Sequence, residues 1–324
     1  MTQSKVIGGW LQRLAKRWQV GAIAYRLYYA PKNVVQKTLQ KGVINTALDA
    51  HYQRQMEQAA GTLPRLSFAS DHEPLDIHFL TGSRFWYQTC FCAYSMARQT
   101  DLPLRPVIYD DGTLNSHHQE AIRRVFPNAQ FFLKPELDSR IDQVLPSAKF
   151  PYLRDRRQHY PNIRKLTDIH AGSQGWKLVL DSDMLFFRPP TLLLQWLQSP
   201  QQPCHMVDTE TAYGYPSSLM AALAGASIRE RINVGICGLN SSDIDWDQLE
   251  FWCRSLIEEQ GTHYYQEQAL VAMLLAGKPC VAMPEDEYVV MPKKEELIHS
   301  KTVLDHYVAD SKSWYFRHGW KLVK

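Results

Sequence analysis

Two aspartates one residue apart follow a short apolar segment in the middle of the chain. The apolar residues 178–180 (LVL) predict a buried strand, and Asp181 and Asp183 stand directly after it. Carboxylates at the end of a buried strand lose hydration and repel each other, so they need a cation or hydrogen-bond donors. A divalent ion meets both needs, because hard oxygen ligands suit Mg²⁺ and Mn²⁺. Such an ion also neutralises phosphate oxygens, so the pair predicts a metal clamp for a substrate that contains a diphosphate.

An Asp-x-Asp pair is a common pattern, and either carboxylate could instead cap a turn or a helix. The surrounding residues favour the metal. The pair is followed by the apolar residues 184–187 and then by Pro189 and Pro190, which stop the segment. Polar residues elsewhere in the chain are possible partners for the two aspartates.

Two further predicted strands carry, or are followed by, residues that could bind a nucleotide. Residues 75–81 (LDIHFLT) form the first. Ligands of α/β folds collect at the carboxyl ends of strands, so Thr81, Gly82 and Ser83 are candidates to contact a base or ribose. The alternative is an ordinary strand-to-helix turn. Residues 231–240 form the other strand, in which Gly235 allows the backbone to approach a ligand and Asn233 lies close by.

Three helical or C-terminal segments supply other candidates. In the basic helical stretch 152–170, Lys165 is the residue we expect to reach a phosphate, while its neighbours form a solvated face. Glu267 and Gln268 open a helix predicted over 264–275, either facing the cleft or simply satisfied at the helix start. His306 and Lys312 follow: an imidazole can be the third protein ligand of a metal, and an ammonium can contact the same diphosphate. Alone, His306 could equally be a surface or core histidine.

The size and composition are those of a globular enzyme. The chain has 324 residues, enough for one large α/β domain with an appendage, which we prefer to two small domains. Six cysteines are scattered without zinc-ligand spacing, so we expect buried reduced thiols and a reducing cytoplasm. We find no secretory segment and no apolar run of spanning length, which argues against secretion and against an integral anchor.

Charge divides the chain unevenly. No acid precedes Asp49, whereas eight lysines and arginines do, so the formal net charge of +3 combines a basic arm with an acidic body. We place the arm at 1–65, mainly helical, and the catalytic domain at 66–324. The arm's basic and aromatic residues suit docking on an anionic membrane surface, which would make the protein peripheral, or a helix packed on its own domain. Nucleic-acid binding is disfavoured because the body is acidic.

Taken together, these segments resemble the GT-A nucleotide-sugar transferases, and most closely the family-eight retaining glycosyltransferases. Five motifs occur in the order found in that family. Lys165-Leu166 stands in the place of its Arg-Leu, LVLDSDM contains its DxD, and NVGICGLN matches its NxGxxxxN pattern at Asn233, Gly235 and Asn240. Glu267-Gln268 stands in the place of its Asp-Gln, and HYVADSKSW matches its HFxGxxKPW pattern at His306, Lys312 and Trp314. Five motifs in one order are far more specific than any one of them. The chain departs from the family at Tyr307, Ala309, Ser313, Lys165 and Glu267, and Gly82 stands where the family has an acid.

The resemblance implies an α/β GT-A fold with a mixed central sheet, flanked by helices, and an enzyme of the hexosyltransferase type. The donor would be a nucleotide sugar, with UDP-sugar expected, and the acceptor is unknown. Asp181, Asp183 and His306 would hold Mn²⁺ or Mg²⁺. The expected donor-binding residues are Thr81, Gly82, Lys165, Asp181, Ser182, Asn233, Gly235, Glu267 and Lys312, and the expected catalytic residues are Gln268, Asp183 and Lys312.

The resemblance also assigns roles. The metal and Lys312 would stabilise the leaving diphosphate where its charge develops, and Gln268 would lie near the reacting face of the sugar. The segment that carries His306 and Lys312 would order over the donor as a lid. Two alternatives stay open: a haloacid-dehalogenase-like phosphatase, whose strand also ends in DxD, and an inactive GT-A domain kept as a binding or scaffold protein.

Overall fold

The computed structural model describes residues 43–67, 73–295 and 301–324. The chain divides into two units, 1–54 and 55–324. The division falls within helix α4 (Val43–Ala60). Most of the basic arm lies outside the described residues, so its membrane docking and the domain boundary at 65/66 stay predictions. None of the described helices is long and apolar enough to cross a membrane.

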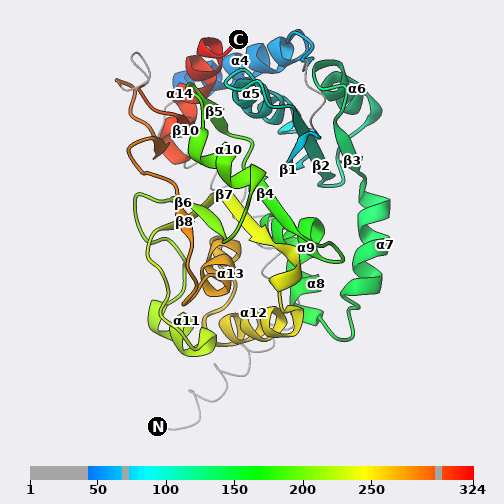
Figure 1. Cartoon of the computed structure of the whole chain (residues 1–324), viewed down its shortest axis with the longest axis vertical. Helices are drawn as coiled ribbons and strands as arrows, with labels where there is room; N and C mark the ends of the chain where they lie inside the picture. The colour runs from blue at the N-terminus through cyan, green and yellow to red at the C-terminus, as the bar shows by residue number, and fades with distance from the viewer. Residues whose placement is uncertain (1–42, 68–72, 296–300) are drawn as a thin grey trace. The chain divides into compact units, whose positions relative to one another are not determined.

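A seven-stranded mixed sheet forms the centre of the second unit, with strand order β3-β2-β1-β4-β7-β6-β8 (Figure 1). Strands β3, β2, β1 and β4 are parallel, β7 is antiparallel to β4 and to β6, and β8 is parallel to β6. The strands are β1 (Leu75–Thr81), β2 (Leu104–Asp110), β3 (Gln130–Phe132), β4 (Trp176–Leu180), β6 (Cys204–Val207), β7 (Ile232–Asn240) and β8 (Val281–Ala282). The predicted α/β class and mixed sheet are therefore confirmed.

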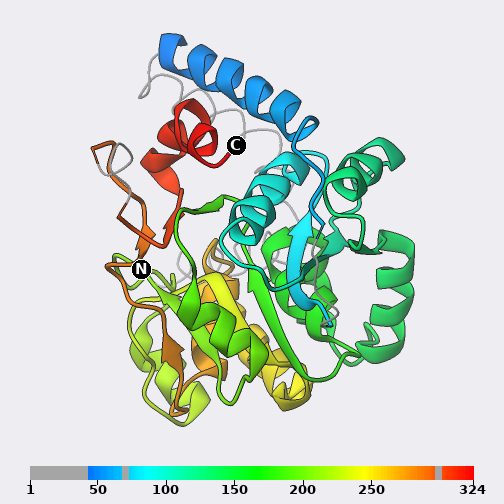
Figure 2. The same ribbon diagram turned by 45° about the horizontal axis from the view of Figure 1, so that its top comes forward.

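A second, three-stranded sheet joins the middle of the chain to its C-terminal segment. Its order is β5 (Met184–Phe186), β10 (Leu304–His306) and β9 (Tyr288–Val290). Strand β10 runs antiparallel to β5, with His306 opposite Met184, and parallel to β9. Figures 1 and 2 show α14 (Lys312–Arg317), drawn in red, beside β5 and β10. The small sheet thus places the C-terminal segment next to the loop between β4 and β5.

Helices cover the large sheet and form its core. Helix α5 (Trp86–Ala97) contacts both β1 and β5, and all of its residues are buried. A large apolar cluster joins residues of β7 to α8, α11, α12 and α13. The remaining helices are α6 (Ser116–Val125), α7 (Lys134–Val144), α8 (Pro151–His159), α9 (Arg164–His170), α10 (Thr191–Gln198), α11 (Ser217–Ala224), α12 (Trp246–Gln260) and α13 (Gln266–Leu274).

Local sequence signals explain several element boundaries. The Asn115 side chain accepts a hydrogen bond from the His118 backbone N–H and completes a capping box at the start of α6. The Asp245 side chain accepts from the Gln248 backbone N–H at the start of α12. Five of the six cysteines are buried free thiols, and Cys280, which is half-buried, is the exception to the expectation.

Three histidines are buried in the large sheet and its helices: His78, His170 and His205. Burial lowers the pKa of all three, and for His170 it lowers the pKa to about 3, with Lys177 adding to the effect. The His170 ring instead forms a neutral hydrogen bond, 2.9 Å long, between Nδ1 and Ser241 Oγ. Below a pH of about 6.5, these histidines therefore bind protons in the unfolded chain but stay neutral in the folded chain.

This sets the sign of a pH dependence. Because the folded pKa is depressed below the unfolded value, stability is lost as pH falls below about 6.5, by about 2 kcal/mol at pH 5 for each histidine that stays neutral. We expect urea unfolding to show a lower free energy at pH 5 than at pH 7. The variant His170→Asn should reduce this difference, whereas exposed His117→Asn should not. An unchanged pH dependence in His170→Asn would contradict the assignment.

Candidate metal centre and donor site

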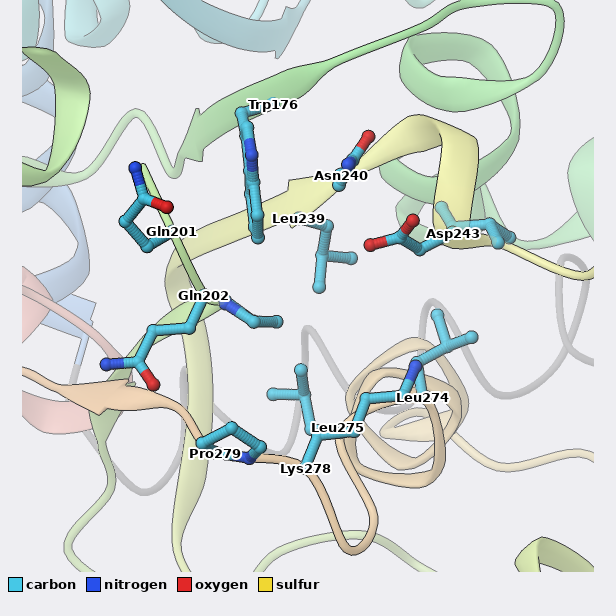
Figure 3. A pocket seen from close by; sticks show the side chains of 12 residues that line it. Trp176, Gln201, Gln202, Leu239, Asn240, Asp243, Leu274, Leu275, Lys278 and Pro279 are labelled. Atoms are coloured by element: carbon cyan, nitrogen blue, oxygen red, sulfur yellow. The ribbon is translucent and has the colours of Figure 1, made fainter. Parts of the chain in front are cut away.

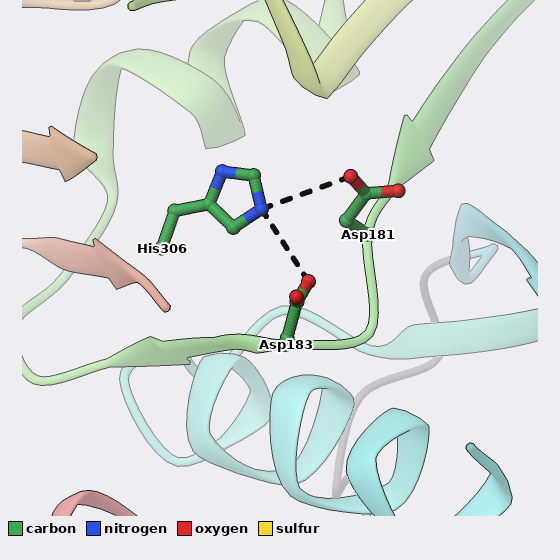
Figure 4. Close-up of side chains that lie close together, drawn as sticks. All are labelled: Asp181, Asp183 and His306. Atoms are coloured by element: carbon green, nitrogen blue, oxygen red, sulfur yellow. Dashed lines mark ion pairs between the residues drawn. The ribbon is translucent and has the colours of Figure 1, made fainter. Parts of the chain in front are cut away.

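Asp181, Asp183 and His306 lie together at the end of β4 (Figure 4). One ligand atom from each residue lies within 4.8 Å of the other two. His306 Nε2 is 3.4 Å from Asp183 Oδ1 and 3.7 Å from Asp181 Oδ2. The structure thus brings together the three residues that the sequence named as metal ligands, although they come from distant parts of the chain.

The backbone explains why the imidazole reaches the aspartates. The Tyr307 backbone N–H donates to the Asp183 carbonyl oxygen at 2.9 Å, which extends the pairing of β10 with β5. On the other side, the Asp181 N–H donates to the Gly235 carbonyl oxygen, also at 2.9 Å. A Cβ on Gly235 would lie 2.5 Å from Cε1 of His306, so only glycine leaves room for the ring here. Gly235 was predicted to let the backbone approach a ligand, and in the structure it makes room for the His306 side chain.

The three side chains fit a divalent metal ion. The His306 side chain is 2% exposed, and neither ring nitrogen has a hydrogen-bond partner in the described parts of the chain. A buried imidazole without partners is costly unless it binds something. Two ligands that are each about 2.1 Å from one ion lie about 3 Å apart at a right angle and about 4 Å apart when opposite. The observed separations of 3.4 and 3.7 Å fall between these limits.

Two lysines contact the carboxylates. Lys312, at the start of α14, forms an ion pair with Asp183 Oδ2. Burial would raise the pKa of Asp183, but Lys312 and His306 outweigh it and hold this pKa well below its usual range. Lys165 Nζ, on α9, lies 2.8 Å from Asp181 Oδ1 and 3.5 Å from Glu267 Oε2. Both aspartates therefore have an ammonium group beside them.

Lys165 and Glu267 form a buried pair. Burial opposes the charge of Lys165, but Asp181 and Glu267 raise its pKa, so the ammonium is retained. Burial raises the pKa of Glu267 to about 7, and Lys165 offsets part of this rise. Lys165 thus links Glu267 to the metal ligand Asp181, and Glu267 does not serve only as a helix-start residue.

Thr81 and Gly82, at the end of β1, lie beside other polar side chains. Thr89 Oγ1 lies 2.9 Å from the hydroxyl oxygens of both Thr81 and Ser182, which joins β1 to the Asp181–Asp183 loop through α5. Gly82 faces Asp111, whose Oδ1 would lie 2.0 Å from a Cβ at this position. Sequence reasoning missed Thr89, because its role depends on how α5 packs.

Gln268 and Asn233 meet at a residue that the sequence did not single out. Asp208, directly after β6, accepts hydrogen bonds at Oδ2 from Asn233 Nδ2 at 2.9 Å and from Gln268 Nε2 at 3.5 Å. The signal that could have found Asp208 is the one that found Asp181: an acid immediately after a buried strand.

A separate pocket lies near the opposite end of β4 (Figure 3). It has a volume of about 300 Å³ and is lined by residues such as Trp176, Leu239 and Asn240. Trp176 begins β4 and Asp181 follows its end, so about 16 Å of extended chain separates them at about 3.3 Å per residue. None of the expected site residues lines this pocket.

The sheet order and the similarity to solved structures show the fold: the chain has the GT-A fold. Two solved structures are particularly similar. One is the galactosyltransferase LgtC in complex with donor and acceptor sugar analogs, at 16% identity and a TM-score of 0.51, covering 76% of this chain and 95% of that one. The other is mouse xyloside xylosyltransferase 1, at 9% identity and a TM-score of 0.50, covering 74% and 99%. No protein-family model matches the sequence, and no curated protein matches it significantly.

Gly235 offers a test of the metal centre that substitutes none of the three ligands. In Gly235→Ala the new methyl group displaces the imidazole, so we expect the affinity for Mn²⁺ to fall at least tenfold, measured by titration calorimetry. The matched control is Gly238→Ala in the same strand, where the methyl group would meet Cys204 and Trp196 at 2.5 Å. Both variants should lose thermal stability, but only the first should lose affinity. Equal affinities in the two would argue against a metal at His306.

Proposed function

We propose that this protein is a metal-dependent glycosyltransferase that moves a sugar from a nucleotide diphosphate sugar, with UDP-sugar as donor, to an acceptor, with retention. The observation that carries the proposal is the convergence of Asp181, Asp183 and His306 at the end of β4 in a GT-A fold. The donor and acceptor sugar analogs bound to LgtC support a nucleotide-sugar donor and a sugar-containing acceptor.

The local charges explain why a metal would be needed. In the described parts of the chain, the carboxylates of Asp181 and Asp183 are paired with the ammonium groups of Lys165 and Lys312, and Lys165 also contacts Glu267, whose pKa is raised to about 7. Without a cation this site carries no net positive charge, and it becomes negative as Glu267 ionises, so it would not attract a diphosphate. A divalent ion, Mn²⁺ or Mg²⁺, held by the two aspartates and His306 reverses the sign and supplies electrostatic stabilisation of the leaving group.

The protein residues have distinct roles in this proposal. Lys312 stabilises the diphosphate as its charge develops, and Lys165 keeps Asp181 and Glu267 oriented. The donor lies across the ends of β1, β4 and β7, where Thr81, Gly82, Ser182, Asn233 and Gly235 approach it. Closure of the segment that carries His306 and Lys312 remains a prediction, as do the cytoplasmic location and the peripheral membrane contact.

The fold bears differently on the two alternative functions. The GT-A fold argues against the haloacid-dehalogenase-like phosphatase, and a phosphomonoester hydrolysis assay should be negative. An inactive binding or scaffold domain has the same fold and is separated by activity alone. The charged and metal-ligating side chains are all in place, which supports an active enzyme.

Donor binding is tested by thermal stabilisation. We expect a panel of UDP-sugars to raise the melting temperature only when Mn²⁺ or Mg²⁺ is present, since a ligand that binds only the folded chain stabilises it. Asp183→Asn should abolish the shift and lower turnover of the UDP-sugar more than a hundredfold. Asp286→Asn, at an exposed acid that is not one of the expected site residues, is the control. A metal-independent shift, or none for any sugar nucleotide, would remove the proposal.

Lys312 separates catalysis from metal binding. In Lys312→Met the ammonium is lost while the three metal ligands remain, so Mn²⁺ affinity should change little. We expect kcat to fall by about a hundredfold, the range found when one charge-stabilising donor is removed. Single-turnover kinetics and a Mn²⁺ titration on the same protein measure the two effects. A purely structural role would leave kcat unchanged in the folded variant.

A further inference from the structure

The pocket near the start of β4 is built by segments that take no part in the proposed donor site. Trp176 begins β4 and lies opposite Asn240, the last residue of the antiparallel strand β7. The loop before β6, the turn after β7 and the end of α13 complete the lining. Figure 3 shows the Trp176 ring, Leu239 and the Asp243 carboxylate around one space. Exposed residues such as Asp243 and Lys278 line it, so the pocket opens to solvent.

The Trp176 ring is a fixed wall of this pocket. It packs against Trp196, with ring centroids 5.8 Å apart and ring planes at 88° to each other. The Trp196 Nε1–H donates to the Gln202 carbonyl oxygen at 2.7 Å, which ties the two indole rings to the loop before β6. Trp176 is nevertheless only half-buried, and its own Nε1–H has no hydrogen-bond partner in the described parts of the chain. The pocket therefore has a rigid aromatic surface with an available donor.

Polar side chains that line the pocket also have bonding capacity to spare. Asn240 Oδ1 accepts from the Ser242 backbone N–H at 3.1 Å, but its Nδ2 donates to none of the described residues. Within the same residues, the side-chain amide of Gln202 forms no hydrogen bond, and Asp243 and Lys278 form no ion pair. The amides of Asn240 and Gln202 are not buried, so water satisfies them until a ligand takes its place. The pocket thus offers both donors and acceptors.

The lining selects a class of ligand. Trp176, Leu239 and Leu275 give the pocket a mainly apolar surface, which suits the face of a ring. Its two charged groups, Asp243 and Lys278, have opposite signs, so an ionic ligand gains little. The volume of about 300 Å³ lies at the lower end of the range for small-molecule pockets, about 300–1,000 Å³. A single uncharged ring that carries several hydroxyl groups meets these conditions, and a sugar residue is such a ring.

We propose that this pocket is a second saccharide-binding site, which takes one uncharged sugar residue and is separate from the donor site. The choice of a saccharide rests on the proposed function, because a glycosyltransferase encounters sugar-containing acceptors. The C–H groups of one sugar face carry partial positive charge and lie on the negative face of the Trp176 ring. The hydroxyl groups bond to Asn240 Nδ2, the Gln202 amide and the Asp243 carboxylate. Such a site holds part of a saccharide without contacting the metal centre.

Binding of free sugars to the full-length protein tests the proposal. Galactose, glucose, N-acetylglucosamine, lactose and maltose are titrated in the absence of metal and nucleotide, and binding is followed by saturation-transfer NMR. Cyclohexanol is the matched probe, because it has a six-membered ring but only one hydroxyl group. We expect at least one of the sugars to bind, and cyclohexanol to bind at least tenfold more weakly than that sugar.

Substitutions in the pocket locate the bound sugar. Trp176→Ala should weaken its binding about tenfold, because the aromatic surface is lost. Asn240→Asp keeps the Oδ1 acceptor for Ser242 but removes the Nδ2 donor, and should weaken binding about three- to tenfold. It also decides the question if Trp176→Ala does not fold. Phe251→Ala, at an exposed aromatic residue of α12 that does not line the pocket, is the control and keeps the parent affinity.

The two sites should separate cleanly. The pocket variants should keep the affinity for UDP with Mn²⁺ within about twofold of the parent, since they change no residue of the donor site. Asp183→Asn should show the opposite result, with UDP binding lost and sugar binding in the pocket kept. This pair of measurements distinguishes a second site from an acceptor position beside the metal.

Parent-like sugar affinity in every folded pocket variant would overturn the inference, because the sugar would then bind elsewhere. Equal binding of cyclohexanol would also overturn it, since the pocket would then be a general apolar cavity. If the parent binds UDP with Mn²⁺ but none of the sugars, the inference is lost and the proposed function stands. Sugar binding that depends on Trp176, without sugar transfer or UDP binding, would instead remove the proposed function and keep the site. Absence of all three would remove both.

Discussion

The cost of placing two carboxylates at the end of a buried strand is the constraint on which this site depends. Asp181 and Asp183 follow β4, and each is matched by an ammonium group, from Lys165 and Lys312 respectively. Neither lysine is near the aspartates in the sequence, so the fold must deliver them. The positions of α9 and α14 beside the same loop can be understood as the electrostatic solution to that problem.

The small sheet fixes the position of His306 beside the two aspartates. Pairing of β10 with β5 sets the register, and His306 falls opposite Met184, one residue after the aspartate pair. A slip of one residue would turn the imidazole to the other face of the strand. Gly235 completes the arrangement from the large sheet, because a larger residue there would occupy the space of the ring.

Sequence reasoning predicted the strands β1, β4 and β7 and the ligand set, because each has a local signal. An apolar run that ends in acids marks Asp181, and a capping box marks the start of α6. It missed Thr89 and Asp208. An acid directly after a strand marks Asp208, but its partners, like those of Thr89, are set only when β6 pairs with β7 and α5 packs on β1. The pairing of Glu267 with Lys165 was hidden for the same reason.

The wide spacing of the site residues in the chain has a consequence for biosynthesis. Asp183 and Lys312 are separated by 129 positions, and His306 also lies far beyond the aspartates. Any chain that stops short of β10, whether still on the ribosome or cut by a protease, carries the acids without their imidazole and ammonium partners. Such fragments would expose uncompensated carboxylates and lack the third metal ligand. The ability to bind the metal would therefore be gained in one step, late in synthesis.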